Sequence, residues 1–247
     1  MDIDYSKVYL SFSSKIILNK KIIKEIELLR KGYPLAYITK RKVFYKYEFY
    51  IDERVLIPRE DTSVLIDYII KSCSYIKEPK ILDLCTGSAN ILISLILEFK
   101  RGFGVGIDNS LQALEVARIN SHKFALNNRV DLLCADVFNV CDILKGKIFD
   151  IIVCNPPYVG LMESDYEDSI KYEPRRAIFA EEKGFIFYKK LLPIVNKLCK
   201  RDGFIIFEIN PNLYDKIVKL CEDLSLTFVT IYDLENRPRA ICWKNCL

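Results

Sequence analysis

Residues 80–89, which read KILDLCTGSA, decide the fold of this chain. The first half of this stretch is apolar and β-branched, which is typical of a buried strand, and the second half consists of small residues. A small-residue turn between a strand and a helix lets backbone N–H groups and the helix N-terminus approach a ligand closely. We therefore predict a strand over 80–85, a ligand-binding turn, and a helix that begins after Ser88.

Strand and helix patterns alternate along the rest of the chain. Apolar runs that predict buried strands are FGVGID (103–108), VDLLCAD (130–136), FDIIVCN (149–155) and GFIIFEI (203–209), and LTFVTIYDL (226–234) with RAICWK (239–244) predicts a closing antiparallel pair. Ser110 is expected to cap a helix over 111–123. This alternation predicts an α/β, doubly wound sheet of about seven strands, with ligands beyond the carboxyl ends of the strands.

The segment before this sheet has a different pattern. Residues 20–31 carry apolar residues at helical spacing and precede Gly32 and Pro34, which predicts a short helix. Residues 43–57 are rich in aromatic and β-branched side chains, and the charged residues 52–54 in their middle predict the turn of a β-hairpin. A further helix should follow, capped by Asp61 or Thr62.

Composition and charge narrow the class of protein. The chain has 247 residues, of which 51% are hydrophobic and 28% charged, and its net charge is +4. These values are typical of a soluble globular protein, and the short basic cluster at 40–42 is better interpreted as a solvated turn than as a phosphate contact. The N-terminal residues do not have a signal-peptide pattern, and no apolar run is long enough to span a membrane. We expect a cytoplasmic protein that is a monomer.

Nine cysteines and one histidine are present, without a CxxC pair. This spacing argues against a zinc site or a disulfide framework, so no metal is expected. Cys73, Cys134, Cys154 and Cys221 stand in apolar runs and are expected to be small core residues in a reducing compartment. The single histidine, His122, is expected to be solvated.

Acidic residues end three of the predicted strands or their turns. Asp83 ends the strand before the small-residue turn, and Asp108 ends the next strand, where a carboxylate can accept hydrogen bonds from both hydroxyls of a ribose. Dinucleotide-binding folds share this layout, and a purely structural turn remains an alternative. Asp136 either meets the amino group of an adenine or caps a helix.

The most specific motif is Asn155-Pro156-Pro157-Tyr158, directly after a predicted strand. The two prolines lock the backbone and remove two N–H donors, so acceptors dominate this segment. The Asn155 side-chain oxygen and the Pro156 carbonyl can hold the two hydrogens of a planar NH2 group, and Tyr158 offers a flat face for stacking. This arrangement favours transfer of a group to an amide or amino nitrogen.

The NPPY motif and the DLCTGSA turn resemble amino-methyltransferases that act on adenine, guanine or glutamine NH2 groups. Further stretches are similar to the release factor glutamine methyltransferases, the PrmC/HemK family, from about Ile22 to the C-terminus: PLAYI (34–38), VLIPREDT (55–62), YEP (172–174) followed by Ala177, and FEI (207–209). The resemblance implies a Rossmann-like methyltransferase fold with a short N-terminal helical docking region at 1–40, a β-hairpin linker at 41–60 and a catalytic domain at 61–247. It also implies methyl transfer from S-adenosylmethionine to the glutamine amide in the Gly-Gly-Gln loop of class 1 peptide chain release factors.

The same resemblance assigns site residues. Catalysis is assigned to Asn155, Pro156 and Tyr158, and substrate binding to the same residues with Pro157. The residues expected to bind the cofactor are Asp83, Cys85, Thr86, Gly87, Ser88, Ala89, Asp108, Asp136, Val137 and Asn155. The chain departs from the family pattern where Cys85 and Ala89 replace glycines and where Val137 replaces an aromatic residue. Its N-terminal region is also short by several tens of residues. A cysteine at a position with positive φ would cost about 1 kcal/mol or more.

Two alternatives stay open from the sequence. An adenine amino-methyltransferase acting on tRNA or another nucleic acid would use the same NPPY motif on a flipped base, although the chain shows no strong basic region for a nucleic-acid partner. A non-catalytic homologue with impaired cofactor binding is the second alternative, and the two glycine replacements motivate it. The glutamine reaction does not require a prior general base, because the methylated amide cation loses its proton readily.

Overall fold

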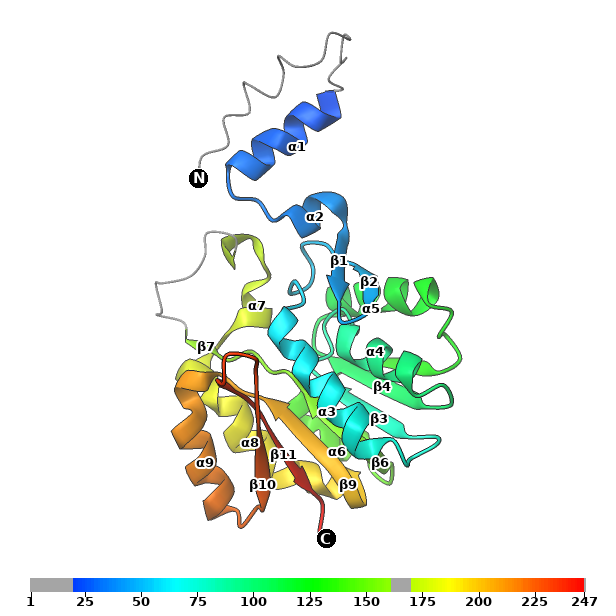
Figure 1. Ribbon diagram of the computed structural model, residues 1–247, viewed down its shortest axis with the longest axis vertical. Coiled ribbons are helices and arrows are strands. Elements are labelled where there is room, and N and C mark those ends of the chain that lie inside the picture. Colours follow the sequence, from blue (N-terminus) through cyan, green and yellow to red (C-terminus); the bar gives the residue numbers. More distant parts are fainter. Residues whose placement is uncertain (1–19, 161–169, 247) are drawn as a thin grey trace.

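A computed structural model describes residues 20–160 and 170–246, and a seven-stranded sheet forms its centre (Figure 1). The order of its strands is β10-β11-β9-β6-β3-β4-β5. Their bounds are Lys80–Leu84 (β3), Phe103–Asp108 (β4), Val130–Cys134 (β5), Phe149–Cys154 (β6), Cys199–Glu208 (β9), Phe228–Tyr232 (β10) and Pro238–Lys244 (β11). Neighbours from β9 to β5 pair in parallel, and β11 runs antiparallel to β9 and β10. The predicted seven strands and the closing antiparallel pair are confirmed.

Helices cover both faces of this sheet. Packed on one face are Ser63–Cys73 (α3), Asn90–Glu98 (α4) and Leu111–Lys123 (α5), and on the other Val140–Ile143 (α6), Phe185–Val195 (α8) and Tyr214–Asp223 (α9). Successive strand residues point to opposite faces, so Ile151 and Val153 enter one core while Ile152 and Cys154 enter the other. Two buried cores on one sheet confirm the doubly wound α/β fold.

The N-terminal elements lie outside the sheet, with the hairpin packed beside α4 and α5 and the first helices extending away from it (Figure 1). They are the helices Lys20–Arg30 (α1) and Leu35–Thr39 (α2) and a hairpin of Arg41–Phe44 (β1) with Tyr47–Tyr50 (β2). The helix over 20–31 is confirmed. The hairpin exists, but its predicted turn at 52–54 was wrong, because the chain reverses at Tyr45, whose φ is 54°. The charged residues 52–54 instead form a separate turn, in which the Asp52 carboxylate accepts from the Arg54 N–H and guanidinium.

Two local predictions about helix starts had different outcomes. Ser110 caps α5 as expected, since its Oγ accepts from the N–H of Ala113 at 3.2 Å. The predicted capping of α3 by Asp61 or Thr62 was wrong: Thr62 occupies the N-cap position without a side-chain cap bond, and Asp61 Oδ2 accepts from Arg239 at 2.6 Å. A strong ion pair with β11 takes the carboxylate away from the helix end.

The burial of the cysteines follows the sheet order. Cys73, Cys154 and Cys221 are buried as predicted. Cys134 is exposed, contrary to the prediction, because it ends β5 at the edge of the sheet. His122 is exposed in the last turn of α5. Within the described ranges there is no cluster of three or more residues suited to bind a metal, and no helix there has the length and apolar character needed to cross a membrane.

Candidate functional site

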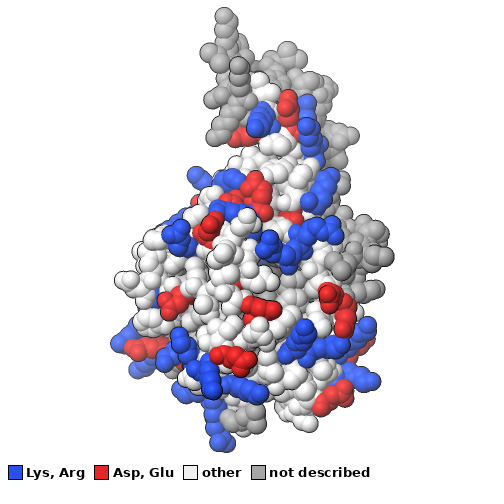
Figure 2. Space-filling model, turned by 180° about the vertical axis from the view of Figure 1, so that it is seen from behind, with Lys and Arg blue, Asp and Glu red and all other residues white. Residues whose placement is uncertain are grey.

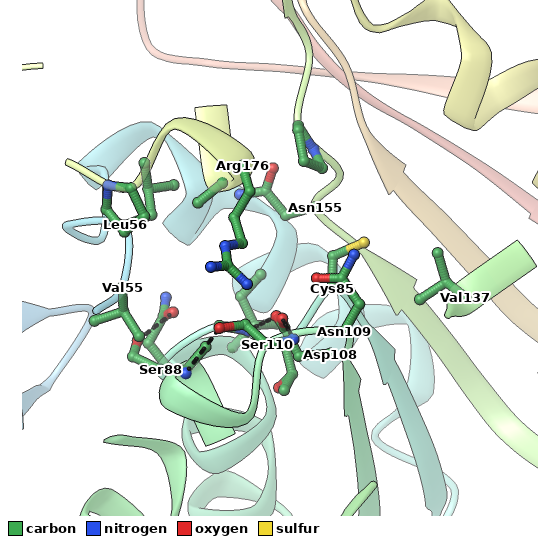
Figure 3. Close-up of a pocket in the computed structure, with 18 of the residues that line it drawn as sticks. Val55, Leu56, Cys85, Ser88, Asp108, Asn109, Ser110, Val137, Asn155 and Arg176 are labelled. Atoms are coloured by element: carbon green, nitrogen blue, oxygen red, sulfur yellow. Dashed lines mark hydrogen bonds between the residues drawn. The ribbon is translucent and has the colours of Figure 1, made fainter. Parts of the chain in front are cut away.

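A cavity opens at the carboxyl ends of β3, β4, β5 and β6 (Figure 3). Its floor is the turn of residues 85–88 and the loop of residues 108–110, and Asn155 contributes to its wall. Residues 54–62 and the short helix Arg175–Ile178 (α7) complete the lining. This is the edge of the sheet where a doubly wound fold places its ligands.

The turn after β3 has a left-handed backbone at alternate residues. The φ angles are 60° at Cys85, 54° at Gly87 and 60° at Ala89. The two residues that replace glycines therefore occupy strained positions, at a cost of about 1 kcal/mol each or somewhat more. Cys85 lines the cavity, whereas Ala89 is fully buried at the start of α4 and does not. The sequence located the strain correctly, but Ala89 lies behind the surface that a ligand would touch.

Asp83 supports this turn from beneath. Its Oδ2 accepts from the Thr86 hydroxyl at 2.6 Å, and its side chain is not part of the cavity lining. Burial raises the pKa of Asp83 to about 7, against the hydrogen bonds from Thr86 and the backbone of Leu92. Asp83 therefore acts on the site through Thr86, which does line the cavity.

Asp108 lies at the centre of the cavity floor. Its Oδ2 accepts from the Gly87 N–H and its Oδ1 from the Ser110 N–H, both at 2.9 Å. Burial raises its pKa, while these backbone bonds and the positive charge of Arg176 oppose the rise. Each carboxylate oxygen has one backbone donor and retains a second lone pair for a ligand hydroxyl.

An aromatic pair forms one wall of the cavity. Asp136 lines it but also caps the short 3-10 helix that follows, where its Oδ1 accepts from the Phe138 N–H at 2.9 Å. Val137 lines the cavity without a ring, as the sequence indicated. The next residue, Phe138, packs against Phe187 with ring centroids 5.0 Å apart, and both line the cavity. The ring of Phe138 therefore provides an aromatic surface directly after Val137, the position where the family pattern has an aromatic residue.

The segment Asn155–Tyr158 leaves the end of β6 beside this cavity. Asn155 and Pro157 line it, and Pro156 and Tyr158 do not. The Tyr158 hydroxyl instead donates to Glu208 Oε1 at 3.0 Å. The structure thus brings Asn155 together with Asp108 and Cys85 at the cavity, as Figure 3 shows, whereas Tyr158 is not among the residues that line it.

A buried carboxylate holds the roof of the cavity. The side chain of Glu173 is fully buried, and it accepts from the Ile57 N–H at 2.9 Å and from Arg59 Nη2 at 2.6 Å. These bonds join two stretches of the chain, VLIPREDT and YEP, that lie more than a hundred residues apart. Pro58 and Pro174 from the same stretches line the cavity.

Comparison with known proteins shows the family to which the chain belongs. Residues 77–233 match the family described as "Methyltransferase domain". The chain is 32% identical over 208 residues to the release factor glutamine methyltransferase of Dictyoglomus turgidum, an alignment that covers 83% of this chain and 72% of that protein. This chain belongs to the release factor glutamine methyltransferase family.

Other family relatives are longer. The chain is 34% identical over 247 residues to the bifunctional methyltransferase of Rickettsia bellii, but this alignment covers 44% of that protein, so the chain spans less than half of its length. Among solved structures, a methyltransferase from Pyrococcus furiosus superposes with a TM-score of 0.58 at 15% identity, over 91% of this chain and 99% of that one. The fold is therefore that of the methyltransferases.

Two residues in or next to this cavity were not predicted from the sequence. Arg176 extends into the cavity from α7, with its guanidinium towards Asp108 and Ser110 (Figure 3). Asn120, fully buried in α5, accepts from the Tyr50 N–H at 2.7 Å and donates to the carbonyl of Ser88 at 3.0 Å. It thereby ties the hairpin to the floor turn. Arg176 follows the recognised YEP stretch, which was a usable signal, but an asparagine within a helix gave none.

Proposed function

We propose that this chain transfers a methyl group from S-adenosylmethionine to the side-chain amide nitrogen of the glutamine in the Gly-Gly-Gln loop of class 1 peptide chain release factors. The observation that carries this proposal is the position of Asn155, which opens onto the same cavity as Asp108 and the turn of residues 85–88. The membership of the family and the name of the Dictyoglomus turgidum relative support the choice of substrate.

The cavity residues fit the proposed cofactor. Asp108 has free lone pairs for the two hydroxyls of a ribose, and Val137, Phe138 and Phe187 form an apolar wall suited to a purine ring. Asp136, at the edge of this wall, is the candidate acceptor for the purine amino group. Cys85 narrows the floor by its side chain but leaves the cavity open.

The reaction needs alignment more than acid–base chemistry. When bound, the cofactor would supply a methyl group on a sulfonium, whose sulfur leaves as a neutral thioether. The Asn155 side-chain oxygen and the Pro156 carbonyl would each accept one hydrogen of the glutamine NH2, so that its nitrogen faces the cavity. Because Pro156 and Pro157 restrict the backbone, these acceptors are preorganised, and alignment of this kind contributes a large part of the rate.

Methylation of a defined peptide tests the proposal. Purified protein, S-adenosylmethionine and a release factor with a Gly-Gly-Gln loop are expected to yield a tryptic peptide heavier by one methyl group, and the same factor with Gln changed to Asn should stay unmodified. Methylation of adenine in bulk tRNA with an unmodified peptide would refute the glutamine assignment.

The surface charge argues for the protein substrate. The basic residues Lys40 and Lys42 lie 2.8 Å from Glu53 and 2.9 Å from Glu60, so their charges are paired. The face drawn in Figure 2 likewise mixes basic and acidic side chains.

Calorimetric titration with the cofactor tests the third possibility, a family member that no longer binds it. We expect saturable binding, because the strained turn at Cys85 and Ala89 is accommodated within a well-packed core. An absence of binding heat together with a cooperative thermal unfolding transition would indicate a folded, non-catalytic homologue.

A further inference from the structure

Three contacts hold Tyr158, which does not line the cavity. Its hydroxyl donates to Glu208 Oε1 at 3.0 Å, and its carbonyl accepts from Asn210 Nδ2 at 3.1 Å. The backbone of Tyr158 packs closely on Gly184: a Cβ atom on residue 184 would lie 2.3 Å from the Tyr158 Cα. A tyrosine tethered in this way has one orientation of its ring and one path for its backbone.

Glu208 makes the first of these contacts from a buried position at the end of β9. It ends β9, next to β6, and its side chain is 1% exposed. Its Oε2 has no hydrogen-bond partner among the described residues. Burial raises its pKa to about 7, although Thr62, Tyr158 and Arg239 favour the charged form. A buried carboxyl group with an unpaired oxygen lowers stability, so the fold alone gives no reason for a glutamate here.

The segment between Asn155 and Tyr158 transmits the position of one end to the other. Pro156 and Pro157 fix two successive φ angles, so the segment has few soft torsions. The segment begins at Asn155, directly after β6, which the sheet holds in place. It ends at Tyr158, whose hydroxyl is bonded to Glu208. The direction of the Asn155 and Pro156 acceptors therefore depends on both anchors.

We propose that Glu208 is a positioning residue, which fixes the Tyr158 ring through its hydroxyl and thereby sets the direction in which Asn155 and Pro156 present their acceptors to the substrate amide. Glu208 does not itself line the cavity. This inference rests on the proposed function for its kinetic consequence, but its structural content is independent of the substrate.

Four variants separate positioning from general stability. Glu208→Ala removes the acceptor for the Tyr158 hydroxyl, Glu208→Gln retains an acceptor oxygen, and Tyr158→Phe removes the donor. Tyr188→Phe is the matched control, because the fully buried Tyr188 donates to the Glu208 carbonyl at 2.8 Å without touching Tyr158 through that bond. Each variant is assayed for methylation of the Gly-Gly-Gln peptide, for cofactor affinity and for the 15N–1H signal of the Asn155 side-chain amide.

Positioning predicts a specific pattern. Glu208→Ala is expected to lower kcat by about 10- to 100-fold, as a misplaced reacting group does, with unchanged cofactor affinity and a shifted Asn155 amide signal. Tyr158→Phe should reproduce this loss, the double variant should be no worse than either single one, and Glu208→Gln should restore most of the rate. Tyr188→Phe should keep both the rate and the Asn155 signal of the wild type.

Two results would overturn the inference. One is a Glu208→Ala enzyme with wild-type kcat and an unshifted Asn155 signal. The other is an equal loss of rate in Tyr188→Phe, which would assign the effect to packing. If the wild-type protein does not methylate the peptide, the proposed function fails, and the Asn155 amide signal alone then decides whether Glu208 positions the segment.

Discussion

Replacing Asp108 by alanine is expected to weaken cofactor binding while leaving the fold intact. In the structure, each oxygen of this carboxylate already accepts one backbone N–H, from Gly87 or Ser110, at 2.9 Å. Asp108 lines the cavity, and the remaining lone pairs of its carboxylate are the proposed acceptors for a ribose. The substitution thus removes both the support of the floor turn and the contacts to the cofactor.

The size of the effect follows from these contacts. Hydrogen bonds to a charged group contribute about 1.5–3 kcal/mol each, and the lower end applies because each oxygen also serves a backbone donor. Two lost bonds amount to about 3 kcal/mol, which corresponds to roughly a hundredfold rise in the Kd for S-adenosylmethionine. At saturating cofactor, kcat should change much less, because Asp108 does not reach the methyl acceptor in the proposed arrangement.

Calorimetric titration measures the Kd, and Asp233→Ala provides the control. Asp233 also accepts two backbone N–H bonds, from Glu235 and Arg237 at 2.9 Å, but it lies in the β10–β11 connection outside the cavity. The Asp233→Ala variant should be destabilised to a similar extent as Asp108→Ala, but its Kd for the cofactor should equal that of the wild type. A Kd for Asp108→Ala within about threefold of the wild-type value, well below the change expected for two hydrogen bonds, would refute the placement of the ribose over β4.

Three further outcomes are expected. Asn155→Ala should lower kcat on the order of 100-fold with an unchanged melting temperature, and transfer of tritiated methyl that matches the wild type would contradict its role. Burial raises the pKa of Glu208 from 4.5 to about 7, so the folded state binds this proton more tightly than the unfolded state, and the free energy of unfolding falls as pH rises through this window. Urea denaturation between these two pKa values should show a smaller fall in the free energy of unfolding for Glu208→Gln than for the wild type. If the free energy of unfolding of both proteins changes with pH in the same way, the buried carboxyl group of Glu208 does not titrate as expected. Cys85, which lines the cavity, should be alkylated by iodoacetamide only without cofactor, whereas exposed Cys134 reacts in both states; equal labelling of Cys85 in a peptide map would place the cofactor elsewhere.

Most of the site could be located from the sequence because its residues directly follow buried strands. Asp108 and Asn155 stand at the ends of apolar runs, and parallel strands bring their carboxyl ends to one edge of the sheet. The strain at Cys85 was predictable for the same reason, since a tight turn after a strand demands φ values that glycine adopts most easily. The direction of Tyr158 was not predictable, because it depends on a partner at the end of β9.

The sequence by itself determined the elements of this protein and the floor of its cavity, because hydrophobic periodicity and turn chemistry act between neighbours in the chain. Only the tertiary structure decided the roof, where Glu173 holds Ile57 and Arg59, and the bridge from Asn120 to the hairpin. The tertiary structure also shows that the hairpin turn lies at Tyr45 and that Asp61 forms an ion pair with Arg239. A polar side chain binds whichever partner the packed elements bring within reach, and no local pattern encodes that choice.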